Sequence, residues 1–187
     1  VNLYGTRRRI ERIFADSLDR VRRLVELKID PMRALARPSR YWRSPFDALA
    51  TLPRRVRSGP VLAREIPLSS LPRVTGWPGD GGPFITLPLV YTQHPEKRGH
   101  NLGMYRMQVY DERTTGMHWQ THKQGAEHYR RRFKAGEKRM DVAVAIGADP
   151  AVMYSAILPL PPDLDEMMIA GVLRDRKSTR LNSSHGY

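Results

Sequence analysis

Residues 84–120, FITLPLVYTQHPEKRGHNLGMYRMQVYDERTTGMHWQ, carry the pattern that decides the fold. Residues 84–91 are mostly apolar and rich in residue types that favour strands. Residues 104–110 alternate between two faces with the period of two that a strand requires. A polar break at residues 111–115 then leads into a return strand at residues 115–120, as in a hairpin. This stretch therefore predicts an antiparallel, β-rich body.

The flanking sequence predicts further strands and helices around this body. Residues 68–83 are punctuated by proline and glycine and predict a loop. Five other elements are expected: a strand at 61–66, a helix at 125–135, a strand at 140–146, a helix from Asp149-Pro150 through Ile157, and a last helix capped by Asp163 and running through Leu173. The fold class expected from this order is α+β.

Residues 1–60 are mostly helical by pattern. Apolar side chains recur every three or four positions over residues 6–28, which predicts one amphipathic helix capped by Thr6 and ending before Asp30-Pro31. Residues 37–40 are expected to form a loop. A second helix is expected to begin at Ser44, because serine is a good N-cap and a proline follows it.

The chain is strongly basic. Lys and Arg total 32 against 19 Asp and Glu, a formal net charge of +13, and residues 1–60 hold 15 of the basic residues against 6 acidic ones. Such a surplus suits nucleic-acid binding, and it leaves peripheral contact with a membrane surface open. The arginines of the first helix, Arg20 and Arg23 among them, lie opposite its apolar stripe. We interpret that face as solvated, because no base-reading pattern accompanies it, and we expect no nucleic-acid partner.

The composition excludes several classes of protein. There is no cysteine, which excludes a disulfide scaffold, a zinc ribbon and a cysteine nucleophile. No apolar run reaches the roughly 18–20 residues of a membrane span, and the N-terminal residues lack the apolar core of a signal peptide. We therefore expect a cytoplasmic protein.

The two ends of the chain have unusual sequences. Residues 175–185, DRKSTRLNSSH, resemble a translated sequencing-library adaptor, and the chain begins with Val1 rather than methionine. We expect residues 175–187 to lie outside the fold and the natural reading frame to have been cut.

General chemical motifs are scarce in this sequence. It contains no GxGxxG, no P-loop and no HExxH. His118 and His122 stand four positions apart, but the first lies in an expected strand, so two unrelated polar histidines are a better interpretation than a zinc pair.

Several ordered blocks nevertheless resemble one family, the UbiD-like decarboxylases. The blocks are NLGMYR at 101–106, GMHW at 116–119, THKQGAEHY at 121–129, DVAVAIGADPAVMYSAILPLP at 141–161 and DEMMIAGVLR at 165–174, with NLYGTRRRIER at 2–12. The resemblance covers nearly all of residues 1–174. It implies a split β-barrel flavin-binding domain over residues 61–174, preceded by the tail of an N-terminal α/β domain over residues 1–60.

The resemblance also implies prenylated FMN and a divalent metal, usually Mn²⁺, with K⁺ as a further ion. The metal ligands it implies are Asn101 and His122, an amide oxygen and an imidazole that suit such an ion. The implied cofactor-binding residues are Met104, Tyr105, Arg106, His118, Trp119, Gln120, Lys123 and Gln124. His118 and Gln120 depart from the common Arg-Trp-Leu triplet of the family, and Gln124 replaces a glycine.

The implied reaction is non-oxidative decarboxylation of an aromatic or α,β-unsaturated carboxylic acid, in ubiquinone or menaquinone biosynthesis or a related pathway. The catalytic residue implied is Arg106, whose planar guanidinium can hold the substrate carboxylate with two hydrogen bonds. A homo-oligomer is expected when the protein is full length.

The resemblance places two acidic groups, a metal ligand and the proton donor, beyond the end of this sequence. Asp163, Asp165 and Glu166 are interpreted instead as caps that complement a helix dipole. The chain alone is therefore expected to be inactive. Two alternatives to the enzyme remain, a non-catalytic FMN-binding split-barrel module and a basic nucleic-acid-binding protein.

Overall fold

The computed structural model describes residues 5–52, 59–96, 99–160 and 164–174. The expectations for Asp163 as a cap and for the tail at 175–187 lie outside the described residues. The chain divides into two compact units, one formed by residues 1–55 with 167–187 and the other by residues 56–166. The domain boundaries drawn from the sequence stay a prediction for the whole protein.

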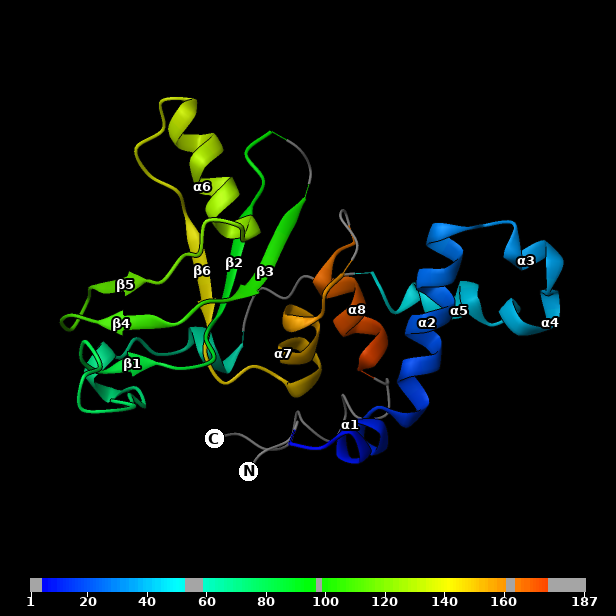
Figure 1. Ribbon diagram of the computed structural model, residues 1–187, viewed down its shortest axis with the longest axis horizontal. Helices are drawn as coiled ribbons and strands as arrows, with labels where there is room; N and C mark the ends of the chain where they lie inside the picture. The colour runs from blue at the N-terminus through cyan, green and yellow to red at the C-terminus, as the bar shows by residue number, and fades with distance from the viewer. Residues whose placement is uncertain (1–4, 53–58, 97–98, 161–163, 175–187) are drawn as a thin grey trace. The chain divides into compact units, whose positions relative to one another are not determined.

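The first unit is helical (Figure 1). Residues 6–28 were expected to form a single helix, but they form two. The helix is interrupted at Phe14, whose side chain is buried. The Thr6 cap is confirmed, since its side chain accepts a hydrogen bond from Arg9 N. The helices of this unit are α1 (Arg7–Ile13), α2 (Ala15–Ile29), α3 (Arg33–Ala36), α4 (Pro38–Tyr41), α5 (Ser44–Leu49) and α8 (Glu166–Leu173), of which Glu166 itself belongs to the second unit.

Three local expectations for this unit were wrong. The segment 37–40 is mostly helix α4, because Pro38 occupies the first turn, where its missing N–H is not needed. Helix α5 does begin at Ser44, as expected, but Ser44 is buried and is not the cap, because Arg43 occupies the cap position without a side-chain bond. Arg20 and Arg23 pair with Asp47 of α5 instead of facing only solvent.

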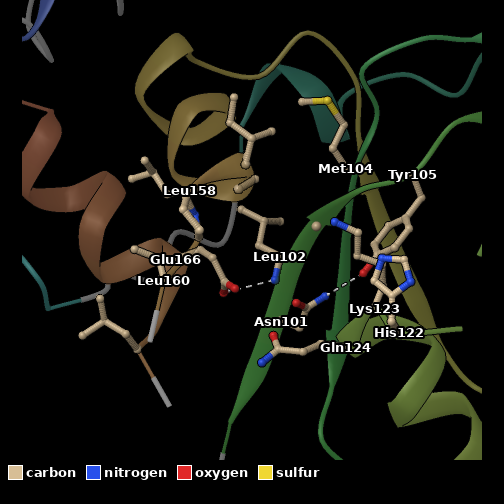
Figure 2. A pocket seen from close by; sticks show the side chains of 15 residues that line it. Asn101, Leu102, Met104, Tyr105, His122, Lys123, Gln124, Leu158, Leu160 and Glu166 are labelled. Atoms are coloured by element: carbon tan, nitrogen blue, oxygen red, sulfur yellow. Dashed lines mark hydrogen bonds between the residues drawn. The ribbon is translucent and has the colours of Figure 1, made fainter. Parts of the chain in front are cut away.

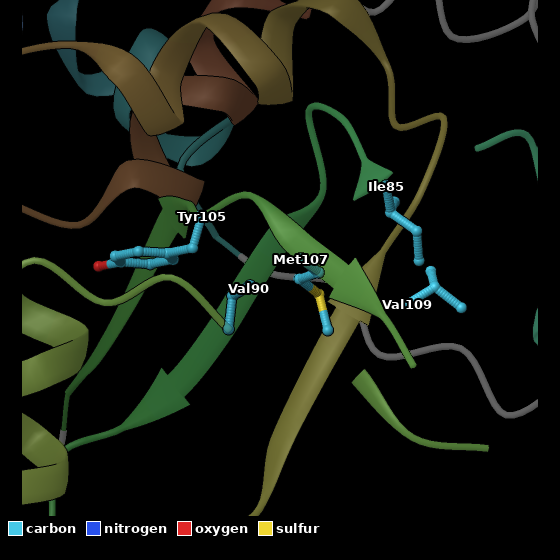
Figure 3. Close-up of a cluster of buried hydrophobic side chains, with 5 residues drawn as sticks. All are labelled: Ile85, Val90, Tyr105, Met107 and Val109. Carbon is cyan, nitrogen blue, oxygen red and sulfur yellow. The ribbon is translucent and has the colours of Figure 1, made fainter. Parts of the chain in front are cut away.

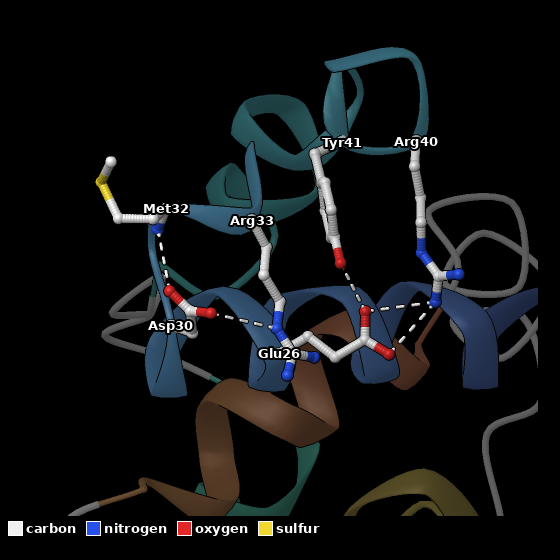
Figure 4. Close-up of polar contacts among 6 residues, drawn as sticks. All are labelled: Glu26, Asp30, Met32, Arg33, Arg40 and Tyr41. Atoms are coloured by element: carbon white, nitrogen blue, oxygen red, sulfur yellow. Dashed lines mark hydrogen bonds and ion pairs between the residues drawn. The ribbon is translucent and has the colours of Figure 1, made fainter. Parts of the chain in front are cut away.

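A second polar cluster ties α2 to α4. Tyr41 Oη donates to Glu26 at 2.6 Å, and Arg40 Nη2 donates to both oxygens of the same carboxylate (Figure 4). The Tyr41 hydrogen bond is the main cause that lowers the pKa of Glu26. Asp30 ends α2, as expected, and accepts from Met32 N and Arg33 Nε.

The second unit contains two antiparallel three-stranded sheets with strand orders β1-β4-β5 and β3-β2-β6. Two of the expected strands pass from one sheet to the other. The segment 84–91 breaks around Leu87, which has a positive φ of 58°, and the segment 104–110 breaks at Tyr105-Arg106. The strands are β1 (Phe84–Ile85), β2 (Leu89–Gln93), β3 (His100–Met104), β4 (Met107–Val109), β5 (Thr115–Met117) and β6 (Val142–Ala145).

The core of this unit lies where the two broken segments meet. Its cluster consists of Ile85, Val90, Tyr105, Met107 and Val109 (Figure 3). The last three come from alternate positions of one segment, so the alternation expected from the sequence survives the break between β3 and β4.

The helices of this unit were mostly expected. Helix α6 (Gln124–Lys134) packs on β2 and β3, and α7 (Pro150–Ile157) packs on β3 (Figure 1). The Asp149 cap of α7 is confirmed, because its carboxylate accepts from Ala151 N at 2.8 Å.

The prediction of a strand at residues 61–66 is wrong. A short 3₁₀ helix (Pro60–Leu62) occupies its start, and a second (Leu68–Ser70) begins the following loop. The observed architecture is mixed α and β, with two open sheets among the described residues. A split barrel stays a prediction for the whole protein. Within the described ranges, no helix combines the length and apolar character needed to cross a membrane.

Candidate functional site

A pocket of about 420 Å³ lies in the second unit beside β3. This volume falls within the range of about 300–1,000 Å³ typical of ligand pockets. The end of α7 and the residues after it, among them Leu158 and Leu160, supply apolar lining (Figure 2). Six residues singled out in the sequence also line it: Asn101, Met104, Tyr105, His122, Lys123 and Gln124.

The antiparallel pairing of β3 explains how Asn101 comes to the pocket. Asn101 pairs with Thr92 of β2, and its side chain is buried. Its Nδ2 donates to Tyr105 Oη at 3.4 Å, so the nitrogen end of the amide is held and the oxygen end is the one suited to a metal.

Tyr105 also connects β3 to helix α6. Its hydroxyl accepts from Gly125 N at 3.2 Å, one of the N–H groups that the first turn of a helix leaves without a helical partner. The ring lies so close to Gly103 that a Cβ there would sit 2.5 Å from it. Glycine at position 103 therefore allows the ring of Tyr105 to lie against β3, the strand that precedes it.

Glu166 lines the same pocket, which the sequence interpretation missed. It does begin α8, as a dipole-complementing residue should, but its Oε2 also accepts from Leu102 N at 3.3 Å, directly beside Asn101 (Figure 2). Burial raises the pKa of this carboxyl. Nearby, Asp165 Oδ1 lies 3.1 Å from His100 Nε2. The sequence signal was an acid placed directly before the apolar run MMIAGVL, and it also fits an ordinary helix start.

Arg106 lies outside the pocket lining, on the segment between β3 and β4. Its Nη1 donates to Asp80 Oδ1 at 3.1 Å, and its Nη2 pairs with Asp80 Oδ2. The guanidinium carbon lies 3.5 Å from the centre of the Phe84 ring. The hydrogen bond from Arg106 is the main cause that lowers the pKa of Asp80. Arg106 therefore already binds one carboxylate through two hydrogen bonds, and this carboxylate is the protein's own Asp80.

His118, Trp119 and Gln120 also lie outside the pocket lining. His118 and Gln120 are exposed, whereas Trp119 packs against the core cluster with its ring centre 6.1 Å from that of Tyr105. The indole Nε1 of Trp119 is buried and has no hydrogen-bond partner within the described residues. Trp119 therefore places this triplet beside Tyr105.

The donors in the pocket suit a divalent cation of the Mg²⁺ or Mn²⁺ type. Asn101, His122 and Glu166 offer an amide oxygen, an imidazole nitrogen and a carboxylate. No group of three or more His, Cys, Asp or Glu residues that could hold a metal occurs in the described part of the chain. A metal in this pocket would therefore rely on the amide of Asn101 as one of its ligands.

Comparisons with known proteins agree with the family resemblance of the sequence. Residues 54–185 match the profile of the family UbiD, described as the 3-octaprenyl-4-hydroxybenzoate carboxy-lyase Rift-related domain. The chain is 41% identical over 182 residues to an uncharacterised protein of Chlamydia trachomatis, covering 94% of this chain and 31% of that protein. It is 35% identical over 184 residues to a protein of Chlamydia pneumoniae that is named as a subunit of 4-hydroxybenzoate decarboxylase, covering 94% and 30%.

A similar solved structure is an evolved dimeric form of the UbiD-class enzyme HmfF from Pelotomaculum thermopropionicum in complex with prFMN. The sequence identity is 28% and the TM-score 0.52, with 56% of this chain and 24% of that chain covered. The chain spans about a third of the length of the curated relatives it matches.

Proposed function

This chain belongs to the UbiD family of carboxy-lyases, and from that premise we propose that it forms the flavin- and metal-binding part of a decarboxylase. The observation that carries the proposal is the pocket beside β3, which collects Asn101, His122 and Glu166 with Lys123. The substrate class we propose is an aromatic or α,β-unsaturated carboxylic acid. Precursors of ubiquinone or menaquinone are the first candidates, and 4-hydroxybenzoate is the acid in the name of one relative.

The residues of the pocket fit a bound Mn²⁺. The oxygens of Asn101 and Glu166 are hard donors, and the imidazole of His122 is a common ligand of this ion. Burial raises the pKa of Glu166, and a cation beside the carboxylate would offset that cost of burying its charge. In this proposal Glu166 supplies an acidic metal ligand within this chain, in place of the one expected beyond its end.

The same pocket fits a flavin phosphate and ring. Lys123 offers a positive charge for a phosphate, and Met104 and Tyr105 offer an apolar wall. Outside the pocket lining but beside Tyr105, the indole N–H of Trp119 has no hydrogen-bond partner among the described residues, and a polar group of a flavin could satisfy it. When bound, prenylated FMN supplies the electron sink for loss of CO₂. In this proposal the chain binds the prenylated FMN and orients the substrate acid. The apolar residues after α7 exclude water from the pocket.

We propose Arg106 as the residue that binds the substrate carboxylate. A guanidinium presents five N–H donors in a plane and can hold two carboxylates on different edges, so its pair with Asp80 does not exhaust it. The full-length enzyme, in this proposal, supplies the proton donor from outside the residues of this chain and works as a homo-oligomer.

Decarboxylation by the full-length enzyme tests the proposal. The enzyme, reconstituted with prenylated FMN and Mn²⁺, should release CO₂ from at least one member of a panel of aromatic and acrylic acids, 4-hydroxybenzoate included. Arg106→Ala should lose most of this activity while still binding flavin. Flavin binding by the wild type with no CO₂ from any acid would instead support a non-catalytic flavin module.

A further inference from the structure

Outside the pocket, Arg106 and Asp80 of the second unit form a two-point ion pair. The Asp80 side chain is only 3% exposed, whereas that of Arg106 is 34% exposed. The carboxylate accepts hydrogen bonds from Nη1 and Nη2, and within the described residues Nε forms no hydrogen bond with it. One edge of the guanidinium plane therefore binds a buried carboxylate, while part of the Arg106 side chain is still exposed to solvent.

Asp80 is itself held firmly by the loop that carries it. Its Oδ2 accepts from Gly76 N at 3.0 Å, and its backbone N–H donates to Trp77 O at 3.0 Å, which closes a tight turn. A Cβ on Gly76 would lie 3.3 Å from Asp80 Oδ2 and 3.8 Å from Arg106 Nη2. The glycine therefore lets the turn approach the ion pair closely.

Aromatic rings restrict the arginine further. The guanidinium carbon lies 3.5 Å from the centre of the Phe84 ring and 5.2 Å from that of the exposed Trp77. Arginine stacks on such faces, and stacking together with a two-point ion pair fixes the plane of the guanidinium as well as its position. A group fixed in this way loses little freedom when it binds a further carboxylate.

We propose that Asp80 is a positioning residue, which fixes Arg106 so that the Nε edge of its guanidinium can receive the carboxylate of the substrate. The inference rests on the proposed role of Arg106 in decarboxylation. It opposes a second view, in which Asp80 competes with the substrate for the arginine. The two views predict opposite signs when Asp80 loses its charge. A positioning role makes carboxylate binding weaker, whereas a competing role makes it tighter.

The test measures binding and turnover in the full-length enzyme carrying prenylated FMN and Mn²⁺. Calorimetry gives the affinity for benzoate, with benzamide as the uncharged analogue, in the wild type, Arg106→Gln and Asp80→Asn. We expect benzoate to bind about tenfold more weakly to Asp80→Asn and benzamide to be unaffected, because displacement of a positioned group is costly. With an acid that is turned over, KM should rise by a similar factor and kcat should change less.

Two further variants keep the test decisive. Gly76→Ala retains every charge but crowds the Asp80 carboxylate, and we expect it to weaken benzoate binding by a smaller factor in the same direction. Gly76→Ala replaces Asp80→Asn as the test variant if Asp80→Asn does not fold. Asp111→Asn, in a hairpin where the carboxylate accepts from Arg113 N and Thr114 N, is the matched control and should leave benzoate affinity unchanged.

The outcomes separate this inference from the proposed function. Unchanged or tighter benzoate binding in Asp80→Asn, or in Gly76→Ala if only that variant folds, would overturn the positioning role even if the wild type releases CO₂. Benzoate binding that does not depend on Arg106 would overturn it as well. If the wild type releases no CO₂ but benzoate binding falls in both Arg106→Gln and Asp80→Asn, the decarboxylase proposal fails and the positioning role stands.

Discussion

Tyr105 joins the candidate metal ligand to the start of a helix, so removing its hydroxyl should weaken both the fold and the site. In Tyr105→Phe the ring stays, but Gly125 N loses the acceptor it now has at 3.2 Å, and Asn101 Nδ2 loses one at 3.4 Å. Tyr105 is 4% exposed and Gly125 is buried, so water cannot readily replace the hydroxyl. An unsatisfied buried donor costs about 1–3 kcal/mol, and the longer Asn101 bond adds less.

Urea denaturation of the chain measures this cost directly. With a slope of about 1–3 kcal/mol per M, the midpoint of Tyr105→Phe should fall by on the order of 1 M. Tyr110→Phe is the matched control, because Tyr110 is 62% exposed and a surface change of this kind usually stays within about 0.5 kcal/mol. Equal midpoints for Tyr105→Phe and the wild type would show that the hydroxyl does not hold α6.

The same substitution should loosen the candidate metal site. Without Tyr105 Oη, the Asn101 amide is free to rotate and no longer presents its oxygen in one direction. Loss of a hydrogen bond that orients a ligand typically lowers metal affinity by about 10–100-fold. Electron paramagnetic resonance of free Mn²⁺ in titrations of the full-length enzyme measures the affinity. Unaltered Mn²⁺ affinity would refute the role of Tyr105 in orienting Asn101.

Three further predictions concern Glu166, Gly171 and His128. Glu166→Gln should lower Mn²⁺ affinity of the full-length enzyme by at least about tenfold in the same titration, because it removes the only carboxylate among the described residues that line the pocket. Gly171→Ala should destabilise the chain by about 1–3 kcal/mol in urea, since the new Cβ would lie 2.2 Å from Ala50 O, whereas Gly99→Ala meets nothing within 4 Å and should not. Burial and then His94 lower the pKa of His128, so the stability that this residue contributes above its unfolded pKa of about 6.5 should be lost as the pH falls below that value. Urea midpoints at pH 7.5 and 5.5 should therefore differ more in the wild type than in His128→Asn, and equal differences would exclude His128 as the cause.

The sequence predicted elements whose signal is local. Helix α7 begins with an aspartate cap and a proline, and both act within one turn, so its start at Asp149-Pro150 was confirmed. The alternation of residues 104–110 reports which side chains face the core, and Tyr105, Met107 and Val109 are indeed buried. The same alternation does not indicate which strands this segment pairs with. The sequence therefore did not predict that the segment passes from one sheet to the other.

Features that depend on distant contacts were harder to predict. Residues 61–66 have a strand-like composition but pair with no strand among the described residues. Composition indicates a preference for strand and does not show whether a partner strand lies within reach. Glu166 had the pattern of a helix-capping acid, and only the contact with Leu102, 64 positions away in sequence, brings it to the pocket. Arg106 was recognised through its motif, but its partner Asp80 sits in a glycine-rich turn that the sequence marked only as a loop.

The location of bound manganese is the sharpest test of the proposed site. Crystals of the full-length enzyme, grown with prenylated FMN and Mn²⁺, should give an anomalous difference peak at the manganese edge in the pocket beside β3. We predict that the peak lies within bonding distance of the Asn101 amide oxygen and the Glu166 carboxylate, with His122 beside it. A manganese peak at another place, with Asn101 and Glu166 making no contact to metal or flavin phosphate, would contradict it.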